Sequence, residues 1–130
     1  MARKRVLVVD DEPDIREVAR VSLEMVGGWE VLTAPSGREG LALAASTKPD
    51  VILLDVMMPD LDGVGTFRLL QADEATRYIP VIFLTAKVMA ADRRQLAELG
   101  VTAVLTKPFD PLTLGSRIAK MLGWPAGAAA

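Results

Sequence analysis

Five polar side chains that could do chemistry stand where apolar stretches of the sequence end. Asp10 and Asp11 follow one stretch, Asp55 another, Thr85 a third and Lys107 a fourth. Three carboxylates, a hydroxyl and an ammonium therefore occupy the same kind of position, tens of residues apart. If the stretches are parallel strands of one sheet, their ends lie at one edge and these side chains form one small site.

Such a site suits a divalent cation beside a phosphoryl group. Three carboxylates in one pocket repel one another, which raises the pKa of at least one of them unless a cation relieves the repulsion. An all-oxygen ligand set favours Mg²⁺ or Ca²⁺, and a site with few protein ligands favours Mg²⁺. Lys107 and Thr85 suit an anion that shares oxygens with Mg²⁺, which is a phosphoryl group. Because a carboxylate can attack phosphorus, the residues predict Mg²⁺-assisted phosphoryl chemistry on an aspartate.

Each of these residues also has a simpler interpretation when taken singly. An aspartate after a strand is usually a helix cap or a turn residue. Thr85 alone would be a loop hydroxyl, and Lys107 alone a solvated charge. We prefer the site because all five residues follow apolar runs of one predicted sheet.

The elements that must position these side chains alternate along the chain. Continuous runs of Val, Ile and Leu are typical of strands buried on both faces. Between them lie segments with helical spacing, one beginning at Pro13 and another at a Ser-Gly-Arg-Glu capping box. The predicted strands cover 6–9, 29–32, 51–54, 81–84 and 101–105, and the predicted helices cover 13–26, a segment after 36–39, 66–72, 86–99 and 111–122.

This alternation, repeated five times, predicts an α/β fold. It implies one parallel sheet with right-handed crossovers and helices on both faces. A chain of 130 residues is the length of one domain. We assign residues 1–124 to that domain and expect 125–130 to form a short flexible tail.

The composition excludes several classes of function. The sequence has no cysteine and no histidine, which excludes disulfides, Cys/His zinc sites and Ser-His-Asp catalysis. A net charge of −2 lacks the basic excess of a nucleic-acid-binding domain. The first apolar run is shorter than the about 7–15 residues of a signal peptide, and no run approaches the ~18 of a membrane span. We therefore expect a cytoplasmic protein without direct nucleic-acid or membrane contact.

Four motifs together resemble the response-regulator receiver domain of two-component signalling, over residues 4–123. They are Val-Val-Asp-Asp at 8–11, Asp-Val-Met-Met-Pro-Asp-Leu-Asp-Gly at 55–63, Leu-Thr-Ala at 84–86 and Lys-Pro-Phe at 107–109. Each motif alone is modest evidence, but the four in this order and spacing are highly specific. The resemblance implies a doubly wound (βα)5, flavodoxin-like fold with strand order 2-1-3-4-5.

The resemblance implies a phosphoacceptor and its metal ligands. Asp55 is expected to accept the phosphoryl group, and Asp10 and Asp11 to hold Mg²⁺ together with Asp55. The backbone carbonyl of Met57 would be a further ligand of the metal.

It also implies roles for the residues around the phosphoryl group. Thr85 is expected to hydrogen-bond the phosphoryl oxygens and to move toward them, and Lys107 to pair with them. The Lys107–Pro108 peptide bond is expected to be cis, and Asp62 and Gly63 to shape the loop after the third strand.

The implied function is signalling rather than turnover of a substrate. A sensor histidine kinase or a phosphotransfer protein would supply the phosphoryl group, and the domain would catalyse only its own phosphorylation and dephosphorylation. The fourth helix, fifth strand and fifth helix would present the result to a downstream protein, and a homodimer through the same surface is a further expectation.

Three positions depart from the usual family pattern. Val104 stands where the family often has Tyr or Phe, so we do not expect an aromatic switch there. Met57 and Lys87 are expected to flank the phosphoryl group, and we hypothesise that they change its lifetime relative to chemotaxis-type receivers, with no direction assigned. We expect Met57 and Met58 to serve packing rather than metal binding, because hard cations prefer oxygen.

Three other functions remain alternatives. A pseudo-receiver would keep the fold as a binding module whose output is independent of phosphorylation. A Mg²⁺-dependent phosphohydrolase would need a second acid/base carboxylate near the nucleophile and a cap over its substrate. A flavodoxin-like flavin protein would need a hydroxyl- and Gly-rich loop after the first strand, where this chain has Asp10, Asp11, Glu12 and Pro13.

Overall fold

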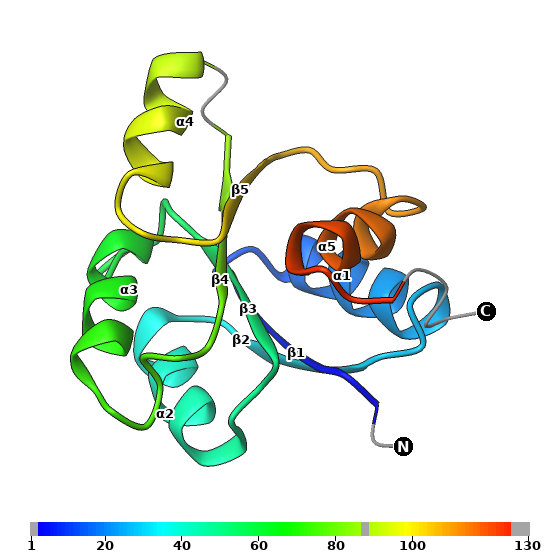
Figure 1. Cartoon of the computed structure of the whole chain (residues 1–130), viewed down its shortest axis with the longest axis horizontal. Coiled ribbons are helices and arrows are strands. Elements are labelled where there is room, and N and C mark those ends of the chain that lie inside the picture. The colour runs from blue at the N-terminus through cyan, green and yellow to red at the C-terminus, as the bar shows by residue number, and fades with distance from the viewer. Residues whose placement is uncertain (1–2, 87–88, 126–130) are drawn as a thin grey trace.

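The residues that the structure describes, 3–86 and 89–125, form five parallel strands and five helices in strict alternation (Figure 1). The coordinates are a computed structural model. The strands are β1 (Arg5–Val9), β2 (Glu30–Ala34), β3 (Val51–Asp55), β4 (Val81–Thr85) and β5 (Ala103–Thr106), and the helices are α1 (Pro13–Met25), α2 (Gly37–Thr47), α3 (Gly63–Ala72), α4 (Ala90–Ala97) and α5 (Leu114–Leu122).

The sheet has the strand order β2-β1-β3-β4-β5, and all neighbouring strands are parallel. The predicted α/β fold and strand order are thus confirmed. The chain places β2 on one side of β1 and β3 on the other, so the strand order reverses between β1 and β3. Open α/β sheets bind ligands at such a reversal, beyond the carboxyl ends of the strands. The register pairs Val9 with Leu54, and each of these residues is followed directly by an aspartate.

Two apolar cores enclose the sheet, one on each face. Helices α1 and α5 cover one face, while α2, α3 and α4 cover the other (Figure 1). Along β1, Val6 and Val8 belong to the first core, and Leu7 and Val9 to the second. Because both faces are buried, the interiors of the central strands are continuous apolar runs, and this explains why no period-two pattern of polar residues occurs in them.

Helix α1 begins at Pro13 as predicted, but three other helices begin at residues other than those the sequence patterns predicted. Helix α3 starts at Gly63 rather than residue 66, because the Asp62 side chain caps it by accepting a hydrogen bond of 2.8 Å from the Gly65 backbone N–H. The two glycines lower helix propensity and hid this start. Helix α4 starts at Ala90 rather than residue 86, although residues 87–88 lie outside the description.

Helix α5 starts at Leu114, three residues later than predicted. The Asp110 side chain accepts from the Leu112 N–H at 2.9 Å, and the Asp110 carbonyl accepts from the Thr113 and Leu114 N–H groups. Asp110 therefore organises a turn before the helix, instead of capping the helix itself.

Two remaining predictions concern membrane spans and the C-terminal tail. No helix in the described part of the chain is long and apolar enough to cross a membrane. Of the predicted tail, residues 126–130 lie outside the description.

Candidate functional site

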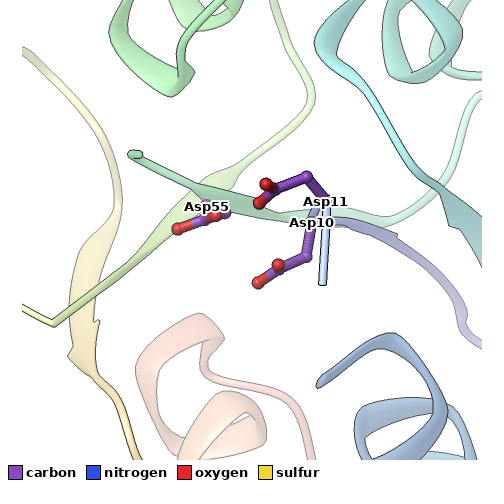
Figure 2. A group of neighbouring side chains, drawn as sticks. All are labelled: Asp10, Asp11 and Asp55. Atoms are coloured by element: carbon purple, nitrogen blue, oxygen red, sulfur yellow. The ribbon is translucent and has the colours of Figure 1, made fainter. Parts of the chain in front are cut away.

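Three aspartates converge at the carboxyl end of the sheet. Asp10 and Asp11 directly follow β1, and Asp55 is the last residue of the neighbouring β3. Figure 2 shows the Asp10 and Asp11 side chains turned toward Asp55. One carboxylate oxygen from each of the three residues lies within 4.8 Å of the others. The structure thus brings together the acids that the sequence analysis grouped.

Asp10 is fully buried and held by backbone contacts. Its Oδ1 accepts a hydrogen bond of 2.9 Å from the Glu12 N–H, which forms the turn that leads from β1 into α1. Its carbonyl oxygen accepts a hydrogen bond of 2.7 Å from Arg16 Nη1, one turn into the helix. The chain can leave this turn as a helix because Pro13 occupies the first helical position, where its missing N–H has no cost.

Lys107 reaches the site from the edge of the sheet formed by β5. It directly follows β5, and its backbone N–H donates to the Thr85 carbonyl at 2.8 Å. Its Nζ lies 2.7 Å from Asp10 Oδ2 and 3.1 Å from Asp55 Oδ1. The predicted cis Lys107–Pro108 peptide bond is present. One ammonium is thus shared between two buried carboxylates.

Asp55 combines burial with incomplete pairing. Its side chain is 3% exposed, and its Oδ1 accepts from the Met57 N–H at 3.3 Å. Its Oδ2 is buried and has no hydrogen-bond partner among the described residues. Burial, reinforced by repulsion from Asp10, raises the pKa of Asp55 from 3.8 to about 6, although Lys107 and the Met57 N–H pull it down. At neutral pH most molecules therefore carry an ionised Asp55 in a site that disfavours its charge.

The pKa of Lys107 reflects the same crowding. Burial alone would lower the pKa of its ammonium, but Asp10 and Asp55 outweigh that effect, and the pKa is raised. Lys107 is consequently charged over the whole physiological range.

Gly63 closes the loop after β3 onto Asp55. A Cβ atom at this position would lie 2.2 Å from the Asp55 carbonyl oxygen and 2.7 Å from Val56 Cα, so no larger residue fits without moving the backbone. The Gly63 N–H donates to the Val56 carbonyl at 2.9 Å. Together with the Asp62 cap, this confirms that Asp62 and Gly63 shape the loop, as predicted.

Thr85 and Met57 occupy the rim of the site in different ways. Thr85 ends β4, one residue beyond the Leu84 that pairs with Asp55, and it is fully buried. Met57 is 66% exposed, whereas Met58 is 8% exposed. The packing prediction is therefore right for Met58 and wrong for Met57. Lys87, the other predicted flanking residue, lies outside the described residues.

Two charged residues near the site were missed by the sequence analysis. Arg16 holds the Asp10 carbonyl, and Glu12 Oε1 lies 3.6 Å from Lys107 Nζ. The available signal was a third consecutive acid at the end of the first apolar run, directly before Pro13. Sequence spacing could not show which way the Glu12 side chain turns.

The residues present fit a hard divalent cation. Asp10, Asp11 and Asp55 offer oxygen ligands only, which suits Mg²⁺ rather than a soft transition metal. The unpartnered, buried Asp55 Oδ2 has the unsatisfied lone pairs that a cation or a covalent ligand would use. Burial and repulsion from Asp10 together raise the pKa of Asp55, and the repulsion would fall on binding a cation.

The structure thus combines an open α/β sheet with an acidic cluster and a lysine beyond its strand-order reversal. The model of the response regulator receiver domain family matches residues 6–119. The chain therefore belongs to this family of two-component signalling proteins, as the four motifs predicted.

Curated relatives are longer regulators. The phosphate regulon transcriptional regulatory protein PhoB of Pseudomonas aeruginosa is 43% identical over 122 residues, which cover 94% of this chain and 53% of that protein. The response regulator PleD of Caulobacter vibrioides is 46% identical over 116 residues, covering 88% of this chain and 25% of that protein. The chain thus spans about half the length of the first and a quarter of the second.

Solved structures include close matches of similar size. The chemotaxis response regulator CheY4 of Vibrio cholerae superposes with a TM-score of 0.84 at 32% identity, covering 92% of this chain and 99% of that one. Nearly the whole chain thus has a structural counterpart in a response regulator.

Proposed function

We propose that this chain is a phosphoacceptor receiver in which Asp55 takes a phosphoryl group from a phosphohistidine. The observation that carries the proposal is the placement of Lys107 Nζ, 3.1 Å from a buried Asp55 and 2.7 Å from Asp10. A buried carboxylate with one unpartnered oxygen lowers the stability of the folded state, but that free oxygen can act as a nucleophile toward phosphorus.

The phosphoryl transfer itself balances with the groups named. An Asp55 carboxylate oxygen attacks phosphorus, the new P–O bond forms, and the P–N bond to the donor histidine breaks. The departing imidazole keeps the electron pair of that bond, and the proton on its second ring nitrogen makes it a neutral leaving group. Lys107 stabilises the charge on the phosphoryl oxygens, and Thr85 donates a hydrogen bond to them. Hydrolysis of the acyl phosphate by water later releases phosphate and restores the carboxylate.

Asp10, Asp11, Asp55 and the Met57 backbone carbonyl would hold Mg²⁺. When bound, the cation supplies Lewis-acid stabilisation of charge on the phosphoryl oxygens. The chain's own contribution is to fix Asp10 through the Glu12 N–H and Arg16, so that its carboxylate is in place before the donor arrives.

The partners follow from this role. The phosphoryl donor would be a sensor histidine kinase or a phosphotransfer protein in the cytoplasm, and α4, β5 and α5 would form the surface read by a downstream protein or by a second copy of the chain. PhoB is a transcriptional regulatory protein, but we propose protein contacts rather than direct nucleic-acid binding for this receiver. Its domain would comprise residues 1–124, followed by the tail 125–130.

Incubation with acetyl phosphate and Mg²⁺, followed by intact mass measurement, tests the assignment. The wild-type chain should gain one phosphoryl group, Asp55→Asn should gain none, and Asp10→Ala should gain it much more slowly. Asp73→Asn, which changes an exposed turn residue away from the site, serves as the control and should behave as wild type. A persistent adduct in Asp55→Asn would place the acceptor elsewhere.

Beryllofluoride separates the proposal from a pseudo-receiver. A receiver should form a Mg²⁺-dependent adduct with it at Asp55, visible as shifts of backbone amides around the site. Absence of both this adduct and the phosphoryl adduct would favour a binding module whose output does not depend on phosphorylation.

A further inference from the structure

Three carboxylates surround the Lys107 ammonium, and one of them lies outside the acidic cluster. Asp10 Oδ2 is 2.7 Å from Nζ, Asp55 Oδ1 is 3.1 Å away and Glu12 Oε1 is 3.6 Å away. Asp10 and Asp55 belong to the cluster that could hold a metal ion, and Glu12 does not. If the cluster binds a cation, Glu12 is therefore the one acid of the three that can still pair with Lys107.

The Glu12 side chain has no competing structural task. Glu12 is the N-cap residue of α1, a position that favours Ser, Thr, Asp or Asn, and its side chain makes no capping hydrogen bond. Asp14 already supplies a negative charge to the first turn of the helix. The simpler view, that Glu12 is only a solvated surface acid with a 60% exposed side chain, does not account for its placement beside the buried ammonium.

Lys107 and a bound cation would compete for the same carboxylates, and a further acid beside Lys107 relieves this competition. In the structure the ammonium contacts Asp10 Oδ2 and Asp55 Oδ1, which belong to two of the three aspartates whose carboxylates lie close enough to share a cation. Asp10 Oδ1 is already engaged by the Glu12 N–H. When Asp10 Oδ2 turns to a cation, Lys107 loses its shortest ion pair and needs another acid to keep it at the pocket.

We propose that Glu12 is a positioning residue that acts through Lys107. It holds the ammonium at the rim, beside Asp55, while Asp10 and Asp11 bind Mg²⁺, and so keeps the positive charge where the phosphoryl group arrives. The proposal rests on the phosphoacceptor role of Asp55 and adds to it a residue outside the acidic cluster.

Mg²⁺ binding to the unphosphorylated chain, measured by calorimetry, tests this role without requiring phosphoryl transfer. Glu12→Gln keeps the size of the side chain and removes its charge. We expect it to raise the dissociation constant for Mg²⁺ about two- to five-fold, the range for a partly exposed ion pair. Asp14→Asn is the matched control, because it removes an exposed acid two residues away that forms no ion pair with Lys107, and it should change the constant less.

A double-mutant cycle with Lys107→Met separates a contact from a general charge effect. Without the ammonium, Glu12→Gln should weaken Mg²⁺ binding no more than Asp14→Asn does. Equal weakening by Glu12→Gln with and without Lys107 would overturn the proposal, since the carboxylate would then act on the cation directly. If Lys107→Met does not fold, as judged by circular dichroism, Lys107→Gln replaces it in the cycle.

The phosphorylation assay distinguishes failure of this inference from failure of the proposed function. With Mg²⁺ at saturation, Glu12→Gln should still form the Asp55 adduct but more slowly than Asp14→Asn, because Lys107 is less well held. If wild type forms the adduct and the two variants match in both assays, Glu12 has no positioning role. If wild type forms no adduct, the phosphoacceptor assignment falls, and the role of Glu12 falls with it.

Discussion

The sheet carries charged groups at both ends of its strands, and the two groups differ in how completely their charges are paired and how deeply they are buried. At the amino end Arg5 begins β1, and its Nε lies 2.8 Å from Glu30 Oε2 on the neighbouring strand. Its Nη1 donates to the Thr47 carbonyl at 2.8 Å, and its backbone N–H donates to Asp50 Oδ2 at 2.7 Å. Every charge in this group has a partner of opposite sign or a hydrogen bond.

At the carboxyl end, two buried carboxylates share one ammonium. Asp10 and Asp55 both contact Lys107, and Asp55 Oδ2 has no hydrogen-bond partner among the described residues. The Arg5 side chain is 41% exposed, whereas that of Asp55 is 3% exposed. Water can therefore screen the charges at the amino end but not those at the carboxyl end.

The comparison indicates where this protein gives up stability for function. The Arg5 group fixes the starts of the strands with ordinary surface pairs. Asp10 and Asp55 instead place two negative charges against one buried ammonium. This arrangement costs stability, but it suits the binding of a cation and the acceptance of a phosphoryl group. Stability and activity conflict at sites of this kind, and the two ends of the sheet should consequently respond to mutation and pH with opposite signs.

The largest expected effect is stabilisation by Asp55→Asn in the absence of metal. Raising the pKa of Asp55 from 3.8 to about 6 corresponds to about 3 kcal/mol of unfavourable interaction when the group is ionised. The folded state binds more protons than the unfolded state between these values, so wild-type stability should fall as the pH rises from about 4 to above 6. Urea unfolding in chelator at pH 5 and pH 8 should show this fall in wild type and little of it in the variant.

Asp50→Asn supplies the control for this prediction at the other end of the sheet. Asp50 accepts from the Arg5 N–H and is exposed, so its substitution should bring no gain in stability. A gain from Asp50→Asn equal to that from Asp55→Asn would show that total charge, and not burial at one end, is responsible.

The next effect is stabilisation by Mg²⁺. A ligand that binds only the folded state at ten times its dissociation constant raises the free energy of unfolding by about 1.4 kcal/mol. Wild type should gain this stability because the cation relieves the repulsion between Asp10 and Asp55, while Asp55→Asn should gain less. Thermal unfolding with MgCl₂, compared with KCl at equal ionic strength, measures the gain. An equal gain in both salts would mean that screening alone is at work.

A smaller effect is expected at Met57, which is exposed at the rim of the functional end. An apolar side chain there can shield the acyl phosphate from water, and Met57→Asn would replace it with an amide that can hydrogen-bond water. The phosphorylated variant should therefore lose phosphate a few-fold faster than wild type in a time course of intact mass. Met89→Asn, which changes another exposed methionine, is the control, and identical decay of all three proteins would exclude a shielding role for Met57.

The sequence was sufficient to predict most of the fold because the strands are continuous apolar runs. The ends of those runs located Asp10, Asp11, Asp55 and Lys107 at one edge, since parallel strands end at the same side of a sheet. That step needed no knowledge of side-chain positions.

The missed features depend on geometry that residue types do not encode. The start of α3 was missed because Gly63 is required by its close approach to the Asp55 carbonyl, not by helix propensity. Met57 was expected to pack because it is apolar, but its side chain is exposed, although its neighbours Val56 and Met58 both belong to the core. The contacts of Glu12 and Arg16 follow from the turn into α1, which a pattern of spacing cannot describe.

The smallest effect should come from removing the Arg5 side-chain charge at the amino end. Arg5→Met keeps most of the aliphatic stem but loses the ion pair with Glu30 and the hydrogen bond to Thr47. Hydrogen bonding to Arg5 lowers the pKa of Glu30 below 4.5, so the stability this pair contributes is present above that value and is lost as the pH falls through the lowered pKa. Urea midpoints should thus show a loss for Arg5→Met at pH 7, smaller at high salt and smaller again at pH 3, opposite in sign to the pH response of Asp55. A loss that grows on acidification would contradict the difference between the two ends of the sheet.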